Sequence, residues 1–341
     1  MKRLIILLIL FPSAFIAQEN HRDALDRYMK AEASVNGFTG TILVKKAGEL
    51  IYENAFGFAD REWNIPNTPQ TKFQIGSVTK QFTAAAILQL AEEGKISLDD
   101  KLSTYIPGFA RGDSITIHTM LIHTTGLKDY EYDQGFLGYA ESLILTKTPH
   151  LQDSLINYFR NNPYDFPVGS KWSYSNTGYY LLGCIIEKLS GLSYSEYVEK
   201  NIIQKAGLEN TFINRWDTIV PNRARGYIES DGKWENAGYM SMEIPFSAGS
   251  ILSTTEDLYK WNKALFSNKI INPSSVELMT TPHTPSLILG NYAYGLFVDE
   301  FSGHPRIGHP GGIYGFASYL VSFPSDDITI IVLSNNESTM V

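Results

Sequence analysis

Residues 77–80 read Ser-Val-Thr-Lys and open a largely apolar segment that ends at Gly94. This segment predicts a helix over residues 77–93 with Gly94 as its C-terminal cap. On such a helix Ser77 and Lys80 lie on one face, so the lysine amine can reach the serine hydroxyl. Ser77 also stands at the helix start, where free backbone N–H groups and the helix dipole favour a developing negative charge. A serine hydroxyl needs this help because it is a weak nucleophile at its ordinary pKa.

The Ser-x-x-Lys spacing alone does not identify a nucleophile. It recurs at residues 230–233 as Ser-Asp-Gly-Lys, a pattern that predicts a turn. Ser77 could equally be an ordinary N-terminal cap of its helix. The assignment therefore depends on two further segments.

The second segment is Tyr-Ser-Asn at residues 174–176, just before a predicted helix. A phenol and a lysine amine both have reference pKa values of about 10, so Tyr174 beside Lys80 would share protons with it and with the serine. Asn176 offers a carbonyl and an amide that could hold a substrate amide and orient Lys80. The same spacing occurs at residues 52–54 within a predicted strand, so Tyr174 could also be an ordinary aromatic residue at a helix start.

The third segment, His309-Pro310-Gly311-Gly312, follows a predicted strand. Glycines at this place would let the backbone of a substrate approach closely, as an added strand does. The alternative is a plain glycine-rich hairpin.

Strands are predicted near both ends of the chain and helices in its middle. Apolar and turn patterns predict helices over residues 22–34, 77–93 and 179–189, capping boxes at Ser193 and Ser253, a hairpin of 41–44 with 50–52, and strands over 295–298, 306–309, 316–323 and 328–333. This order predicts an α+β fold, in which one antiparallel sheet is built from both chain ends and flanked by helices, with a helical insertion. We expect a single domain over residues 18–341, with an α/β lobe of about 18–105 and 240–341 and a helical lobe of about 106–239. A ligand cleft is expected between the lobes.

The composition excludes several other functions. The 341 residues carry a formal net charge of -8 and no cluster of lysine and arginine, so we expect no nucleic-acid partner. The seven histidines form neither a His-x-His nor a His-Glu-x-x-His ligand set, so we expect no metal and no cofactor, and interpret His118 and His123 as structural. Cys184 lies in an apolar helical segment and is interpreted as a core residue.

The N-terminus has the pattern of a secretory signal peptide over residues 1–17. A basic start at Lys2 and Arg3 precedes an apolar run to Ala17 and a polar segment over 18–23. We expect an exported protein, periplasmic or secreted, with no membrane span after the signal is removed. The alternative is an uncleaved N-terminal anchor.

Taken together and in this order, the three segments resemble the penicillin-recognising serine enzymes. They are most similar to the family that includes class C β-lactamases, D-alanyl-D-alanine carboxypeptidases, D-aminopeptidases and related esterases. Residues 121–127 resemble the family's His-Thr-Ser-Gly-Leu stretch, residues 174–183 its middle signature, and residues 248–258 a further characteristic segment. The resemblance extends from about residue 22 to residue 336.

The resemblance implies a role for each site residue. Ser77 would attack a carbonyl and become acylated, while Lys80 and Tyr174 move its proton. The backbone N–H groups of Ser77 and Gly312 would form the oxyanion hole. The residues that would bind the substrate are Asn176, His309 and Gly311.

The function implied is a serine hydrolase that forms an acyl-enzyme on an ester, an amide or a D-amino-acid peptide. The substrate would be a small molecule or a peptide, including one derived from the cell wall. The alternatives are a true class C β-lactamase and a non-catalytic protein that binds penicillin or peptidoglycan peptides on the same fold.

Two features depart from the family pattern. Class C β-lactamases carry Lys-Thr-Gly where this chain has His309-Pro310-Gly311. Histidine has a reference pKa of about 6.5, so we expect attraction of a substrate carboxylate to fade as the pH climbs through the titration of His309, and β-lactam hydrolysis to be weak. The family also closes with a helix on the sheet, whereas this chain stops at Val341, so we expect the natural coding sequence to continue or another element to cover the last strand.

Overall fold

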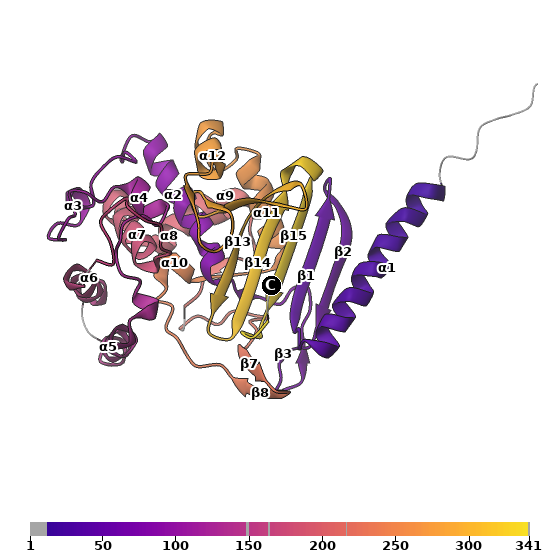
Figure 1. Cartoon of the computed structure of the whole chain (residues 1–341). Coiled ribbons are helices and arrows are strands. Elements are labelled where there is room, and N and C mark those ends of the chain that lie inside the picture. The colour runs from indigo at the N-terminus through magenta and orange to yellow at the C-terminus, as the bar shows by residue number, and fades with distance from the viewer. Residues whose placement is uncertain (1–11, 148–149, 163, 216, 340–341) are drawn as a thin grey trace, which may run out of the picture.

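The computed structural model describes residues 12–147, 150–162, 164–215 and 217–339. Its centre is an eight-stranded sheet with the order β10-β11-β12-β13-β14-β15-β1-β2, in which every neighbouring pair is antiparallel. The strands are β1 (Gly40–Lys46), β2 (Glu49–Phe56), β10 (Thr284–Pro285), β11 (Asn291–Tyr292), β12 (Phe297–Phe301), β13 (His304–Ile313), β14 (Phe316–Phe323) and β15 (Ile328–Ser334). β15 pairs with β1, so both ends of the chain share one sheet, as Figure 1 shows. The predicted α+β arrangement is confirmed.

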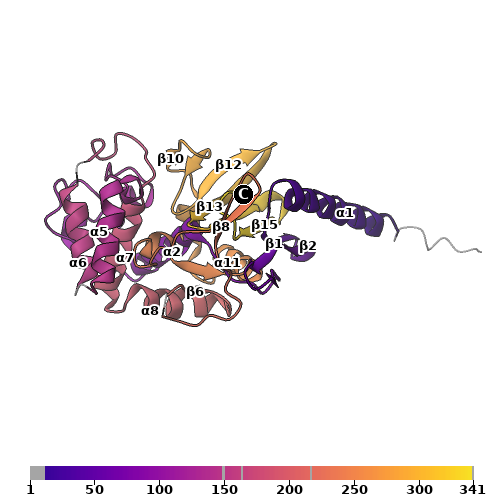
Figure 2. The ribbon, with the colours of Figure 1, turned by 90° about the horizontal axis from the view of Figure 1, so that it is seen from below.

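Most helices lie on one side of this sheet, and α1 (Pro12–Val35) lies at the opposite end beside β2 (Figures 1 and 2). The other helices are α2 (Thr79–Glu92), α3 (Leu102–Tyr105), α4 (Ile117–Leu121), α5 (Gln134–Leu145), α6 (Leu151–Asn161), α7 (Asn176–Ser190), α8 (Tyr194–Val198), α9 (Gln204–Ala206), α10 (Phe246–Gly249), α11 (Thr255–Phe266) and α12 (Pro273–Thr280). The single turns η1 (Gly76–Val78), η2 (Tyr130–Tyr132) and η4 (Pro324–Asp326) are 3-10 helical, and η3 (Glu199–Ile203) is a π-helical turn.

Short strands complete the fold. They are β3 (Phe58–Asp60), β4 (Ile65–Pro66), β5 (Phe73–Gln74), β6 (Phe212–Ile213), β7 (Tyr227–Ser230), β8 (Lys233–Asn236) and β9 (Ile251–Ser253). β5, β9 and β6 form a small sheet with β9 in the middle. Residues 230–233 connect β7 to β8, which confirms that this second Ser-x-x-Lys sequence is a turn.

The large sheet is apolar on both faces. On its inner face Leu43, Leu320 and Ile331 are buried in the main core. On its outer face Ile42 and Val44 form a second cluster with Met29 of α1, and Val332 packs half-buried against this cluster. α1 therefore covers part of the outer face.

The expected signal peptide falls mostly outside the described residues. Residues 1–11 are not among them, and residues 12–17 form the first part of α1. Within the part of the chain that the structure describes, no helix combines the length and the apolar character that crossing a membrane requires.

Helix α2 is buried on all sides, from Thr79 to Leu90. A helix that is enclosed all round must find partners for its polar side chains. Gln81 accepts a hydrogen bond from the Trp261 indole at 3.0 Å, and Thr83 donates to the Ser247 carbonyl at 2.6 Å. These bonds to separate segments fix the rotation of α2 about its axis, and with it the direction of Lys80.

The helix ends follow the predicted caps with two differences. Ser193 forms the capping box predicted for it. At the other site the cap is Thr254, which accepts a hydrogen bond from the Asp257 N–H, because Ser253 is the last residue of β9. Ser77 also lies before its helix, within η1, since α2 begins at Thr79.

Strand β13 approaches η1 closely at Gly311. A Cβ at this position would overlap the Ile75 carbonyl oxygen and the Ser318 hydroxyl. Ser318 donates a hydrogen bond to that same carbonyl at 2.8 Å. Only glycine therefore lets β13 lie against the turn that carries Ser77.

We expect Gly311→Ala to lower the free energy of unfolding by roughly 1–3 kcal/mol, the range typical of overpacking, because the added methyl meets backbone that cannot move aside. Gly312→Ala is the matched control, since no atom lies within 4 Å of a Cβ there. Urea denaturation of both variants measures the difference. Equal stability of the two variants would contradict the close packing of β13 on η1.

Candidate active site

Ser77 lies in η1, and the backbone around it is held against β13. Gly76 has a φ of +48°, and a Cβ on it would come within 2.7 Å of the Gly312 carbonyl oxygen. A non-glycine residue would therefore be strained in its backbone and would collide with β13. This contact sets η1 beside Gly312, and Ser77 and Gly312 line the same two cavities.

The Lys80 amine is completely buried directly behind Ser77. Its Nζ donates to the Ser77 hydroxyl at 3.0 Å, to the Asn176 side-chain carbonyl at 2.7 Å and to the Ala248 backbone carbonyl at 3.0 Å. Burial lowers the pKa of Lys80 to about 7, although the carboxylates of Asp129 and Glu131 raise it. A substantial fraction of the amine is therefore neutral at pH 7 and able to accept a proton.

Tyr174 stands over Lys80, with the amine 4.8 Å from the centre of its ring. Its hydroxyl is buried and makes no hydrogen bond of good geometry. Burial raises the pKa of the Tyr174 phenol well above its usual range, and the neighbouring Ser77 hydroxyl opposes this in part. At neutral pH Tyr174 therefore keeps its proton, and Lys80 is the group that can exchange one.

His123 holds Tyr174 in place. Its carbonyl accepts a hydrogen bond from the Ser173 N–H at 3.0 Å, and its ring Nδ1 accepts one from the Ser175 N–H at 3.1 Å. The His123 and Tyr174 rings lie 4.4 Å apart. These contacts agree with the structural role expected for His123. They also show that His123 bonds to the residues on both sides of Tyr174 in the sequence.

Asn176 connects Lys80 to a pair of carboxylates that were not predicted from the sequence. Its amide nitrogen donates to Asp129 at 3.1 Å and to Glu131 at 2.7 Å, while its carbonyl accepts from Lys80. Burial raises the pKa of Asp129 to about 6. These residues follow the segment 121–127 directly, but nothing in their local sequence indicates that this loop turns back toward Asn176.

His309 is buried and has protein partners at both ring nitrogens. Nδ1 faces the Pro310 carbonyl, which can only accept, so Nδ1 carries the proton. Nε2 of the neutral ring then accepts from the Tyr292 hydroxyl at 3.0 Å. Burial and the nearby Lys80 amine lower the pKa of His309 to about 3.

This arrangement corrects the expected behaviour of His309. Its reference pKa predicted a ring that titrates at about pH 6.5 and attracts substrate carboxylates below that pH. Instead the ring is neutral over the physiological range and both of its nitrogens are engaged within the protein. The predicted pH dependence of carboxylate binding at His309 was therefore wrong.

Two cavities of about 40 and 440 Å³ border Ser77. Gly312 lines both, Asn176 lines the smaller cavity, and Tyr174, His309 and Gly311 line the larger. The charged residues along these cavities are Glu131 and Glu337, with no lysine or arginine among the described lining residues. The charged side chains that line these two cavities are therefore acidic, and the Lys80 amine lies buried behind Ser77.

The other residues singled out from the sequence lie away from Ser77. His118 Nδ1 bonds to the Tyr294 hydroxyl at 2.7 Å, and Cys184 is buried in the core. No three histidine, cysteine, aspartate or glutamate side chains are grouped as a metal site would require among the residues that the structure describes.

Comparison with known proteins identifies relatives over almost the whole chain. A family model described as Beta-lactamase matches residues 24–341. Penicillin-binding protein 4* of Bacillus subtilis is 28% identical over 338 residues, which cover 94% of this chain and 73% of that protein. The crystal structure of a penicillin binding protein from Bacillus halodurans has 31% identity and a TM-score of 0.79, covering 92% of this chain and 95% of the other.

A more distant match is the D-amino acid amidase of Ochrobactrum anthropi SV3. It is 22% identical with a TM-score of 0.79 and covers 94% of this chain and 92% of the amidase chain. At this identity the likeness shows the fold alone. It agrees with the antiparallel sheet and flanking helices described above.

We expect the His309 ring to show no titration between about pH 5 and 9, because burial and Lys80 keep it neutral. Chemical shifts of its ring carbons and nitrogens, measured by NMR across this range, test the point. As a reference, the same ring in the urea-unfolded chain should titrate at about pH 6.5. A folded-state titration at about that same pH would restore the original expectation.

Proposed function

The chain belongs to the β-lactamase family, and on that premise we propose that it is a serine hydrolase that forms an acyl-enzyme on Ser77. The observation that carries this proposal is the hydrogen bond between the buried Lys80 amine and the Ser77 hydroxyl, 3.0 Å long. The substrates we propose are esters, amides or D-amino-acid peptides, including ones derived from the cell wall. Export to the periplasm or the medium is part of the same proposal and is supported by the basic and apolar N-terminus.

The first step that we propose is attack on the substrate carbonyl. As the Ser77 oxygen bonds to the carbonyl carbon, the neutral Lys80 amine accepts the hydroxyl proton. The carbonyl electrons move onto oxygen, which the backbone N–H groups of Ser77 and Gly312 stabilise. Each such donor contributes on the order of 3 kcal/mol to transition-state stabilisation.

The second step releases the leaving group. The bond from the carbonyl carbon to the leaving group breaks, and the leaving atom takes a proton from the Tyr174 hydroxyl. Tyr174 regains a proton from the Lys80 ammonium in the same step, because its phenolate is disfavoured by burial. Water then repeats both steps on the acyl-enzyme and returns Ser77 to its free form. Asn176 keeps Lys80 directed at Ser77 throughout.

The charges around Ser77 favour neutral or cationic leaving groups. Tyr174 lines the larger cavity, so the leaving group lies there, beside Glu131 and Glu337. β-Lactams and D-alanyl-D-alanine peptides place a carboxylate on that side of the scissile bond, where it would be repelled. This supports an amidase or esterase over a class C β-lactamase, for a reason other than the charge of His309.

We expect an active-site serine probe such as a fluorophosphonate to label Ser77 alone. Ser77→Ala should abolish labelling, whereas Ser230→Ala should be labelled like wild type, because Ser230 lies in the β7–β8 turn with the same sequence spacing. Mass spectrometry of peptides locates the adduct. Full labelling of Ser77→Ala would reject the assignment, and the absence of any adduct on wild-type Ser77 would support the non-catalytic binding alternative.

The pH dependence of kcat/KM should follow Lys80. Because the neutral amine is the active form, activity should rise with pH with a midpoint at about 7. Asp129→Asn removes a negative charge that raises the pKa of Lys80, so the midpoint should move to lower pH. Tyr174→Phe should instead lower the rate by about 10²-fold or more at every pH without moving the midpoint. Hydrolysis of acetyl p-nitroanilide, whose leaving nitrogen must be protonated, measures all three profiles, and an unmoved midpoint in Asp129→Asn would contradict this role of Lys80.

A further inference from the structure

A second cavity of about 440 Å³ adjoins the site around Ser77. It shares Met240 and Tyr314 with the smaller cavity at Ser77 and shares Tyr314 and Phe316 with the larger. Unlike the larger cavity at Ser77, it is not lined by Tyr174, Glu131 or Glu337. A ligand could therefore extend from Ser77 into this cavity, away from the proton donor Tyr174.

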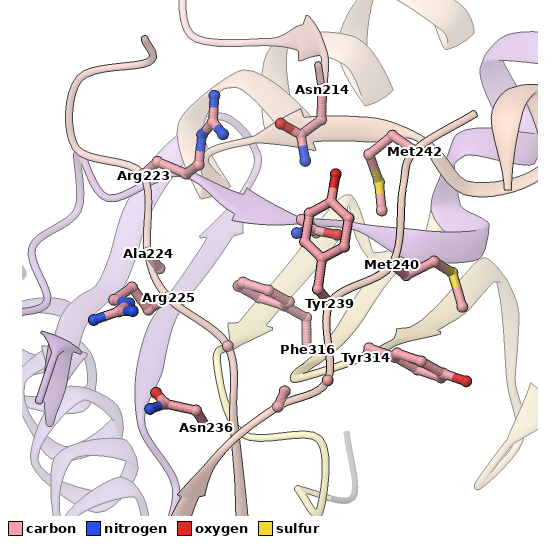
Figure 3. Close-up of a pocket in the computed structure, with 14 residues that line it drawn as sticks. Asn214, Arg223, Ala224, Arg225, Asn236, Tyr239, Met240, Met242, Tyr314 and Phe316 are labelled. Atoms are coloured by element: carbon pink, nitrogen blue, oxygen red, sulfur yellow. The ribbon is translucent and has the colours of Figure 1, made fainter. Parts of the chain in front are cut away.

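Two side-chain carboxamides that line this cavity have carbonyl oxygens without hydrogen-bond partners. Gln74 is the last residue of β5, three positions before Ser77, and Asn214 follows β6 on the other side of β9. The carbonyl oxygens of both side chains are buried and accept no hydrogen bond, and Asn214 is only 6% exposed. Figure 3 shows Asn214 and Tyr239 pointing toward one another across the cavity. Buried acceptors of this kind are normally satisfied, so a ligand with N–H donors would complete them.

The cavity also contains an arginine without an acidic partner. Arg223 donates from Nη2 to the backbone carbonyls of Thr218 at 2.6 Å and Arg215 at 3.5 Å, while its buried Nε has no partner. Arg225 contrasts with it, since Arg225 pairs with Glu62 and, at 3.8 Å, with Asp60. Figure 3 shows Arg225 directed away from Asn214 and Tyr239. Arg223 is thus the guanidinium that can still bind an anion.

We propose that this cavity binds the acyl side of the substrate, and that the acyl group is peptide-like, with at least one amide bond and a carboxylate remote from the scissile bond. The side-chain carboxamides of Gln74 and Asn214 can hydrogen-bond to the N–H and C=O of an amide. The Arg223 guanidinium can pair with the carboxylate. The acyl side is assigned because the leaving group must lie beside its proton donor Tyr174, which lines the other cavity. The inference rests on the proposed function, since it assumes that Ser77 is the acylated residue.

Three p-nitrophenyl esters test this subsite. The first carries succinyl-glycyl-glycine as the acyl group, the second its succinamoyl analogue with a carboxamide in place of the carboxylate, and the third is the acetate. Glycine avoids any assumption about the chirality that the site prefers. We expect kcat/KM to be highest for the succinyl ester, about tenfold or more above the succinamoyl ester, because a charge-assisted contact is lost in the latter.

Arg223→Gln should reduce the ratio of kcat/KM between succinyl and succinamoyl esters to about one. Arg225→Gln is the matched control and should leave that ratio unchanged, since Arg225 is paired and faces away. Asn214→Leu should lower kcat/KM for both glycyl esters relative to the acetate. Arg223→Lys keeps the positive charge but loses the planar guanidinium, and it replaces Arg223→Gln if that variant fails to fold. It should reduce the ratio of kcat/KM between the two glycyl esters in part.

The outcomes separate the two proposals. If Ser77→Ala hydrolyses the acetate as fast as wild type does, the proposed function fails. If wild type uses Ser77 but does not distinguish the succinyl ester from the succinamoyl ester, the subsite is rejected and the hydrolase stands. The subsite is rejected in the same way if Arg223→Gln and Arg225→Gln change the ratio equally.

Discussion

The burial of one amine constrains the whole site. Lys80 lies inside a helix that is enclosed on every side, and an amine there must have its donors satisfied or lose its charge. Its three acceptors come from η1, from the start of α7 and from α10, which are far apart in the sequence. The fold must therefore bring these three segments together, and in doing so it sets the Ser77 hydroxyl within hydrogen-bonding distance of the Lys80 amine.

The need to hold Ser77 beside the buried Lys80 amine also restricts which residues the surrounding backbone can contain. The Ser77 turn can take its position only because Gly76 adopts a positive φ and because Gly311 leaves room for the Ile75 carbonyl. A side chain at either place would separate β13 from η1. The sheet built from both chain ends thus contacts the helical side of the molecule at the turn that carries the Ser77 hydroxyl. The rotation of α2 follows from its bonds to Trp261 and Ser247.

Local sequence patterns predicted much of the fold and of the site. The rest depends on long-range packing, which the sequence does not show. Helix caps, hairpins and the alternation of the C-terminal strands depend on neighbouring residues, so strands such as Phe316–Phe323 were placed correctly from the sequence. The spacing of Ser77 and Lys80 is likewise local. Asp129 and Glu131 reach Asn176 across 45 residues or more. His309 is neutral because burial and the Lys80 amine lower its pKa. Neither effect has a sequence pattern. The unpaired carbonyl oxygens of Gln74 and Asn214 belong to residues at the end of β5 and just after β6. These two short strands are joined through β9, a pairing that sequence periodicity does not reveal.

The charges are distributed unequally on the two sides of Ser77, and this distribution bears on how a substrate would be oriented. Glu131 and Glu337 line the cavity of Tyr174, and Glu131 also lines the smaller cavity at Ser77. Arg223, which has no acidic partner among the described residues, lines the adjoining cavity. A carboxylate in the acyl group would be attracted toward Arg223 and away from Glu131, so the ester or amide carbonyl would enter with its leaving group toward Tyr174. The reverse orientation would place the anion among acidic groups and remove the leaving atom from its proton donor. Electrostatics and proton transfer thus favour the same orientation, and His309, which is buried and neutral, adds no charge that would oppose it.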